Sequence, residues 1–234
     1  MLKNISIITI IVFLLLTLLM ILIMNVVIKR LPETHTGLKE YYTRCKISKG
    51  SNREYFKGYP HTGQYKKDLE KVKKIAIDHI KKHNTKTNRP LAVVFDMDDT
   101  LVYTNNVHNV FPSYLDSPPT EPIFLFPPME EIADIARYAA HDKIKVIIIT
   151  ARPPKSEKAT WYNSSYYGIP VHEVYCDYSR GMNPQFKKEL RKELATQYNI
   201  LLTMGDRWND VVDPGTALGI KLPSPDDTNV YLLN

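Results

Sequence analysis

The chain has 234 residues, with 31 Lys and Arg, 25 Asp and Glu and only two cysteines, Cys45 and Cys176. This length allows a membrane segment plus one sizeable domain with a buried core. Two cysteines cannot form a disulfide framework, which excludes the small disulfide-stabilised domains. We expect two structural thiols unless the domain faces an oxidising compartment.

The charge is unevenly distributed along the chain. Residues 29–90 carry 17 Lys and Arg against 6 Asp and Glu, whereas residues 91–234 carry 13 against 19. The basic part can lie against anionic lipid headgroups, or it can be a solvated lysine-rich face. No nucleic-acid-binding motif accompanies it, so we expect no nucleic-acid partner.

Residues 5–28 follow a short tail over residues 1–4 and contain no charged side chain. Twenty-four helical residues span about 36 Å, enough to cross a hydrocarbon core of about 30 Å. The run is too long for a signal peptide and leads straight into basic residues, so we predict an uncleaved, single-pass transmembrane helix. Positive charges are more frequent after the span than before it, which predicts a cytosolic C-terminal domain: Lys29, Arg30, Lys39 and Arg44 against Lys3.

Residues 29–62 are expected to be a basic linker, and residues 63–234 the main domain. Within residues 66–83, apolar residues recur at helical spacing and predict an amphipathic helix that packs on this domain. A helix lying on the membrane surface is the alternative. The residues of its apolar face are Leu69, Val72, Ile75, Ala76, His79 and Ile80.

The apolar run Leu91–Phe95 predicts a strand buried on both faces, of the kind found in parallel sheets. Asp96, Asp98 and Asp99 follow it directly. Ligand sites of open α/β sheets lie beyond the carboxyl ends of strands, and crowded carboxylates are relieved by a cation or an electrophile. The alternative is an ordinary polar turn. We expect Asp99 to be a solvated neighbour.

The remaining elements alternate between helix and strand. A proline-rich segment over residues 102–128 interrupts them, and we interpret it as a rim of the site. The alternation predicts an α/β fold with a doubly wound, Rossmann-like parallel sheet. We expect helices over 129–141, 156–167 and 184–198, and strands over 144–149, 171–175, 200–204 and 217–222.

Polar side chains also follow the later strands. Thr150 ends the second strand, where its hydroxyl and nearby backbone N–H groups can bind a phosphoryl oxygen. Arg152 can contact a substrate or pair with a carboxylate. The helix over 184–198 offers one inward lysine that would neutralise the carboxylates, Lys187 or, as the alternative, Lys188. The other basic residues there, Arg191 and Lys192, are expected to be solvated.

The fourth strand leads into Gly205-Asp206-Arg207-Trp208-Asn209-Asp210. If a helical turn begins here, Asp206 and Asp210 lie on one face. Carboxylate oxygens suit Mg²⁺. A simple helix cap by an aspartate is the alternative.

These motifs resemble, in the same order, the four signatures of the haloacid dehalogenase superfamily of aspartate-nucleophile phosphatases. The closer resemblance is to its plant vegetative storage protein and class B acid phosphatase branch, subfamily IIIB. The segments that carry it are Gly63-Gln64-Tyr65-Lys66-Lys67-Asp68, Gly205-Asp206-Arg207-Trp208-Asn209-Asp210 and Lys221-Leu222-Pro223-Ser224-Pro225.

The resemblance implies that Asp96 attacks phosphorus and Asp98 acts as acid and base, while Thr150 and Lys187 hold the phosphoryl oxygens. It implies Mg²⁺ at Asp96, Asp98 (through the backbone carbonyl), Asp206 and Asp210. The expected function is a membrane-anchored, Mg²⁺-dependent phosphomonoester hydrolase that acts on a phosphorylated small molecule through an aspartyl-phosphate. A catalytically silent, membrane-tethered storage or scaffold domain and a phosphotransferase are the alternatives.

Overall fold

The computed structural model describes residues 53–57, 59–85, 87–104, 126–179, 183, 185–225 and 227–233. The predicted transmembrane helix over 5–28, most of the predicted linker and residues 105–125 of the proline-rich segment lie outside these ranges. Within them, no helix is both long enough and apolar enough to cross a membrane.

A six-stranded sheet of order β3-β2-β1-β4-β5-β6 forms the centre of the fold. The first five strands run parallel, and β6 pairs antiparallel with β5. The α/β class with mostly parallel strands is therefore as predicted. The strands are β1 Leu91–Phe95, β2 Lys145–Thr150, β3 Glu173–Cys176, β4 Asn199–Gly205, β5 Leu218–Lys221 and β6 Tyr231–Leu233.

The prediction of a purely parallel sheet is wrong at one edge. After β5 the chain turns back, with Ser224 and Asp227 bridged, and β6 returns beside β5 in the opposite direction. A return this tight produces an antiparallel neighbour, whereas a parallel one needs a long crossover. Three residues are too few for a strand pattern to be read from the sequence.

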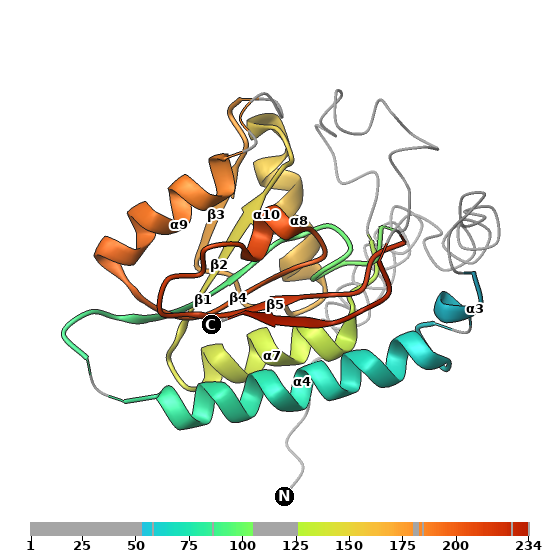
Figure 1. Cartoon of the computed structure of the whole chain (residues 1–234). Coiled ribbons are helices and arrows are strands. Elements are labelled where there is room, and N and C mark those ends of the chain that lie inside the picture. The colour runs from blue at the N-terminus through green and yellow to red at the C-terminus, as the bar shows by residue number, and fades with distance from the viewer. Residues whose placement is uncertain are drawn as a thin grey trace, which may run out of the picture. The chain divides into compact units, whose positions relative to one another are not determined.

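Helices cover both faces of this sheet (Figure 1). α4 and α7 lie side by side on one face, and α9 lies on the other. Short helical segments stand at three further positions: α3, η1 and α10. The full set is α3 Arg53–Phe56, α4 Gln64–His83, α7 Glu130–His141, η1 Pro154–Ser156, α8 Glu157–Tyr166, α9 Phe186–Gln197 and α10 Trp208–Val211.

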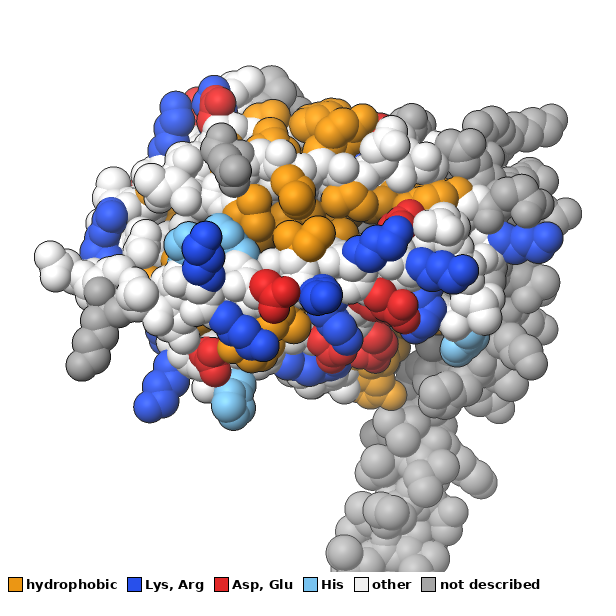
Figure 2. Space-filling model, turned by 60° about the horizontal axis from the view of Figure 1, so that its bottom comes forward, with side chains coloured by type: hydrophobic (Ala, Val, Ile, Leu, Met, Phe, Trp, Pro, Cys, Tyr) orange, Lys and Arg blue, Asp and Glu red, His pale blue; other side chains and the backbone are white. Residues whose placement is uncertain are grey.

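The helix predicted over 66–83 is α4, and it packs on the domain as expected. Two lysines of α4 form ion pairs with α7: Lys66 with the buried Glu131 and Lys73 with Asp134, each at 2.9 Å. Figure 2 brings this face forward and shows basic and acidic side chains interspersed beside a band of hydrophobic ones. Part of the positive charge counted over residues 29–90 is therefore paired within the domain. The buried residues of α4 are Tyr65, Leu69, Val72, Ala76 and Ile80.

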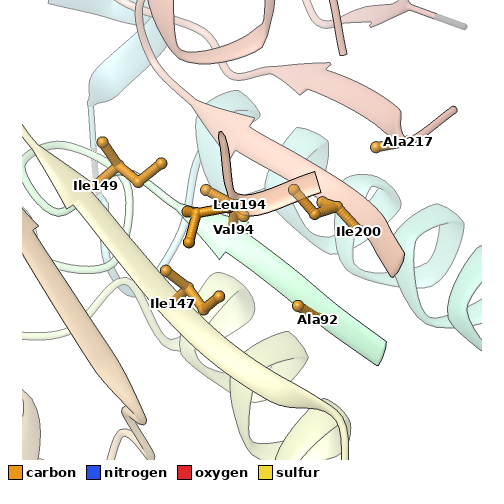
Figure 3. Packing of buried hydrophobic residues seen from close by; sticks show 7 residues of the cluster. All are labelled: Ala92, Val94, Ile147, Ile149, Leu194, Ile200 and Ala217. Carbon is orange, nitrogen blue, oxygen red and sulfur yellow. The ribbon is translucent and has the colours of Figure 1, made fainter. Parts of the chain in front are cut away.

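Alternate residues of the central strands fill the core on the α9 side of the sheet. Ala92 and Val94 of β1 contact Ile147 and Ile149 of β2, and Leu194 of α9 packs over them (Figure 3). Burying such side chains stabilises the fold by about 1.5–3 kcal/mol each. The packing fixes α9 across β1 and β4, so polar residues near its N-terminus are held over the carboxyl ends of these strands.

The strand order reverses at β1. The chain runs from β1 through β2 to β3 in one direction, and β4 then pairs with the other side of β1. In such sheets the crevice at the carboxyl ends of the two strands that flank the reversal is the usual ligand site. Asp96 follows β1 and Asp206 follows β4, so the topology brings the first and last predicted motifs together.

Candidate active site

Asp96 lies directly beyond β1 and is buried. Its backbone N–H donates to the carbonyl of Met204 in β4 at 2.9 Å, which continues the pairing of the two strands. The side chain is thereby held by a fixed backbone at the carboxyl ends of β1 and β4. Thr100 is also buried, with its hydroxyl 3.5 Å from Asp96 Oδ2.

Lys187 reaches the same point from the first turn of α9. Its Nζ donates to Asp96 Oδ1 at 2.6 Å and to Asp210 Oδ1 at 2.5 Å, and the lysine is buried. Lys188, the alternative left open by the sequence, pairs instead with Asp213 at the surface. The geometry thus brings Lys187, and not Lys188, to the carboxylates.

Asp206 and Asp210 come from the end of β4 and from α10. Both are buried, and one oxygen from each of Asp96, Asp206 and Asp210 lies within 4.8 Å of the others. Asp210 Oδ2 also accepts a hydrogen bond from the backbone N–H of Arg207 at 2.8 Å. Gly205 makes this approach possible, because a Cβ there would lie 2.2 Å from Asp210 Oδ2.

The cluster carries more negative than positive charge. Burial raises the pKa of Asp96 to about 7, and the charges of Asp210 and Asp98 add to the rise while Lys187 opposes it. Burial, with Asp99 and Asp96 nearby, raises the pKa of Asp206 well above its usual range. Burial alone would lower the pKa of Lys187, but Asp210 and Asp96 outweigh it and raise the value. One ammonium group therefore does not neutralise the three carboxylates.

The donor set fits a hard divalent cation. Three buried carboxylates provide oxygen ligands, which Mg²⁺ prefers. The pKa values of Asp96 and Asp206 are raised first by burial and further by the neighbouring carboxylates, and a cation would relieve that like charge. Asp96, Asp206 and Asp210 are the residues that could hold it. The Asp98 carboxylate is not part of this group of side chains.

Asp98 is held by Arg152 in a two-pronged ion pair. Arg152 Nε donates to Asp98 Oδ2 at 2.8 Å and Nη2 donates to Oδ1 at 2.6 Å, while Nη1 donates to Thr160 in α8 at 3.1 Å. Of the two roles left open for Arg152, pairing with a carboxylate is the one in the structure. Both Asp98 oxygens are engaged by this buried guanidinium.

Thr150 ends β2, the strand next to β1, and is buried. Its hydroxyl oxygen accepts a hydrogen bond from the backbone N–H of Arg152 at 3.2 Å, which orients the turn after β2. The strand ends therefore bring Thr150 and Asp96 to the same edge of the sheet. Asp99, expected to be solvated, is half-buried and accepts a hydrogen bond from the backbone N–H of Thr104 at 2.8 Å.

The prediction that Arg191 is solvated is wrong. The residue is buried on α9 one turn beyond Lys187, and it donates to the carbonyl oxygens of Asn209 at 2.9 Å and Val212 at 2.7 Å. These two carbonyls flank Asp210, so Arg191 fixes the backbone turn that carries it. The (i, i+4) spacing from Lys187 was the available signal, because it puts both side chains on one helix face.

The family comparison agrees with the motifs. Residues 126–227 match the family model of the HAD superfamily, subfamily IIIB (acid phosphatase). The matched range holds Thr150, Lys187, Asp206 and Asp210 and begins after the strand that carries Asp96. Over these residues, which are less than half of the chain, the sequence is similar to that subfamily. This result confirms the resemblance to subfamily IIIB, whose members are described as acid phosphatases.

The comparison with solved structures finds two of the class C acid phosphatase from Bacillus anthracis. They are 16% identical, with TM-scores of 0.48 and, for the form with tungstate bound, 0.49; the matches cover 68% and 66% of this chain and 68% of each of those chains. A Pnkp1/Rnl/Hen1 RNA repair complex matches at 20% identity and TM-score 0.47, over 59% of this chain and 44% of that one. No curated protein matches the sequence significantly.

Proposed function

We propose that the chain is a divalent-metal-dependent phosphomonoester hydrolase that acts on phosphorylated small molecules, with Asp96 as the nucleophile. The observation that carries the proposal is the buried contact of Lys187 with both Asp96 and Asp210, beside Asp206. A purely structural domain gains little from three carboxylates around one ammonium, because burying unbalanced charge is costly. A site that binds a metal cation and a phosphate needs both the negative carboxylates and the positive ammonium group.

In the proposed reaction, Asp96 attacks phosphorus and the bond from phosphorus to the leaving oxygen breaks, which forms an aspartyl-phosphate on Asp96. Asp98 gives a proton to the leaving oxygen. It then takes a proton from the water that attacks phosphorus, and Asp96 is released as a carboxylate. For these transfers Asp98 has to release at least one of its bonds to Arg152.

Two side chains are proposed to bind the transferred group. Lys187 offers an ammonium that can shift from Asp96 and Asp210 towards equatorial phosphoryl oxygens, and the Thr150 hydroxyl can donate to another. A Mg²⁺ ion held by Asp96, Asp206, Asp210 and the backbone carbonyl of Asp98 would supply positive charge against the phosphoryl oxygens.

The proposal also covers the membrane anchor and the side of the membrane on which the main domain lies. Residues 5–28 are proposed to cross a membrane once, with residues 63–234 on the cytosolic side, which rests on the charge-free run and the basic residues after it. Carbonate extraction of membranes tests the first point, and protease protection of the C-terminal part tests the second.

Turnover of p-nitrophenyl phosphate by the full chain tests the proposed reaction. We expect turnover with Mg²⁺, little with EDTA, and loss of turnover in Asp96→Asn without loss of the folded state. Unchanged turnover in Asp96→Asn would refute the assignment of the nucleophile. A folded wild-type protein without turnover on any phosphomonoester, and without metal binding, would favour the silent storage or scaffold domain.

A further inference from the structure

The helix α8 buries polar side chains where a helix on a sheet usually buries apolar ones. Its buried residues are Thr160, Asn163 and Ser164. Their spacing of three and four residues puts them on one side of the helix. Burying polar groups lowers stability unless each is bonded, so the partners of these three side chains explain why they are there.

Thr160 fixes the guanidinium of Arg152. Its Oγ1 accepts a hydrogen bond from Nη1 at 3.1 Å. The hydroxyl proton of Thr160 goes to the carbonyl of Ser156 at 3.0 Å, which leaves the oxygen as an acceptor. On the other side of the guanidinium, Nε and Nη2 donate to the two oxygens of Asp98 at 2.8 and 2.6 Å. Arg152 thus connects α8 to Asp98 inside the protein, since its own side chain is 0% exposed.

Asn163 fixes the residue whose ring lies over Arg152. Its Oδ1 accepts a hydrogen bond from the backbone N–H of Phe126 at 3.2 Å, and its Nδ2 donates to the carbonyl of Phe126 at 2.9 Å. The Phe126 ring centroid lies 6.0 Å from Cζ of Arg152. Thr160, Phe126 and Asp98 together therefore set the orientation of this guanidinium.

This arrangement separates two aspartates that are only two residues apart. Among the described residues, Asp96 belongs to the carboxylate cluster, whereas Asp98 is held outside it by Arg152. Met97, between them, is buried with its sulfur 3.9 Å from Ser164 Oγ. The separation suits a group that carries a proton, because a carboxylate that binds a metal ion has to be deprotonated.

We propose that Arg152, held by Thr160 of α8, is a positioning residue for Asp98; the proposal rests on the proposed reaction. When Asp98 carries a proton, one of its oxygens accepts a bond from Arg152 and the other faces the leaving oxygen. As the bond from phosphorus to that oxygen breaks, the proton moves from Asp98 to it, and the guanidinium stabilises the carboxylate that remains. The attacking water then returns a proton to Asp98.

The test compares two aryl phosphates whose leaving groups differ in their need for a proton. Phenolate is more basic than p-nitrophenolate, so the kcat/KM of phenyl phosphate depends more on Asp98. For the full chain with Mg²⁺, the measured quantity is the kcat/KM of phenyl phosphate divided by that of p-nitrophenyl phosphate. We expect this ratio to fall by at least about tenfold in Asp98→Asn. It should fall by at least about threefold in Arg152→Lys, which keeps the charge but loses the two-pronged bond.

A second variant and two matched controls complete the test. Thr160→Val removes the bond to Nη1 and should also lower the ratio, and it decides the outcome if Arg152→Lys does not fold. Thr196→Val removes a hydroxyl that also bonds a carbonyl of its own helix, but on the exposed side of α9. Arg137→Lys changes an arginine that also pairs with carboxylates, on α7. Both controls should keep the wild-type ratio.

A ratio that falls in Asp98→Asn but not in Arg152→Lys would overturn the positioning role and leave the proposed reaction intact. The same holds if Arg152→Lys loses activity equally on both substrates, because a merely structural role has that effect. An unchanged ratio in Asp98→Asn would overturn the assignment of Asp98 as the acid. Absence of turnover in the wild type would refute the reaction itself, and both of these results would remove the role of Arg152 as well.

Discussion

The position of Lys187 is what distinguishes a catalytic cluster of carboxylates from an ordinary polar turn. In Lys187→Met, a side chain of similar length loses both bonds to Asp96 and Asp210, and the phosphoryl group loses its cation. We expect kcat for p-nitrophenyl phosphate to fall by at least about a hundredfold, as for other lost transition-state donors. Steady-state kinetics with Mg²⁺ measure this change.

The neighbouring lysine provides the matched control for that change. Lys188→Met removes the same charge from the same helix, but the partner of Lys188 among the described residues is the exposed Asp213, and such pairs contribute little. Its kcat should stay near that of the wild type. If both variants lost activity equally, the ion pairs of Lys187 would not be the cause.

Gly205 makes room for Asp210. In Gly205→Ala the new Cβ would lie 2.2–2.4 Å from side-chain atoms of Asp210, so the carboxylate has to move. We expect Mg²⁺ affinity to fall by about 10- to 100-fold, as for other changes that misplace metal ligands. Calorimetric titration of Mg²⁺ measures it.

Gly168→Ala is the comparison for Gly205→Ala. Gly168 has a φ of +62°, and a Cβ at this position would meet nothing within 4 Å, so alanine there strains the backbone without touching the cluster. It should lower stability and leave Mg²⁺ affinity intact. Equal losses of affinity in the two variants would count against the steric argument.

At the scale of elements, Arg191 connects α9 to the α10 turn. Arg191→Met loses two charged hydrogen bonds to the carbonyls around Asp210, so we expect weaker Mg²⁺ binding together with a lower Tm. Arg137→Met is a suitable control, because Arg137 also donates to two backbone carbonyls, those of Tyr167 and Gly168, away from the cluster. It should lower Tm without weakening Mg²⁺ binding, and a similar loss of affinity in both variants would contradict this role of Arg191.

The sequence predicts elements best where the pattern is long. The run Leu91–Phe95 and the stripe of α4 identify a buried strand and an amphipathic helix, and both are present. β6 and α10 are three and four residues long, and their positions depend on tertiary contacts such as Tyr231 against Trp208. No local pattern predicts elements of that length.

The same distinction holds within the site. Strand ends place Asp96, Thr150 and Asp206, so a motif at a strand end is enough to predict them. Whether a helical lysine or arginine points inward depends on how α9 is rotated on the sheet, which the packing of Leu194 sets. The sequence therefore favours Lys187 as the inward lysine without excluding Lys188. For Arg191 it gives the wrong prediction, a solvated side chain.

For the whole molecule, the cluster predicts an unusual dependence of stability on pH. Asp96 has a pKa raised to about 7, against about 3.9 in an unfolded chain, so the folded state binds its proton more tightly. The folded protein without metal should lose stability as pH rises from about 4 to about 7 through this residue. Asp206 has a raised pKa and acts in the same direction.

The contribution of Asp96 to the pH dependence of stability is isolated by comparing the wild type with Asp96→Asn. Two histidines with lowered pKa values, His79 and His172, act in the opposite direction and are common to both proteins. In EDTA, urea unfolding at pH 5 and pH 7.5 should show wild type losing stability relative to Asp96→Asn. Mg²⁺ should reverse this loss. A wild type whose stability rises relative to that of the variant at higher pH would contradict the charge balance described above.

The central claim is that Asp96 carries the phosphoryl group, and a rapid acid quench of the full chain during turnover with Mg²⁺ tests it most directly. Mass spectrometry of the digested protein should find a phosphoryl group on the peptide that contains Asp96, and none in Asp96→Asn. Turnover without any such adduct, or with the adduct on another residue, would contradict the account.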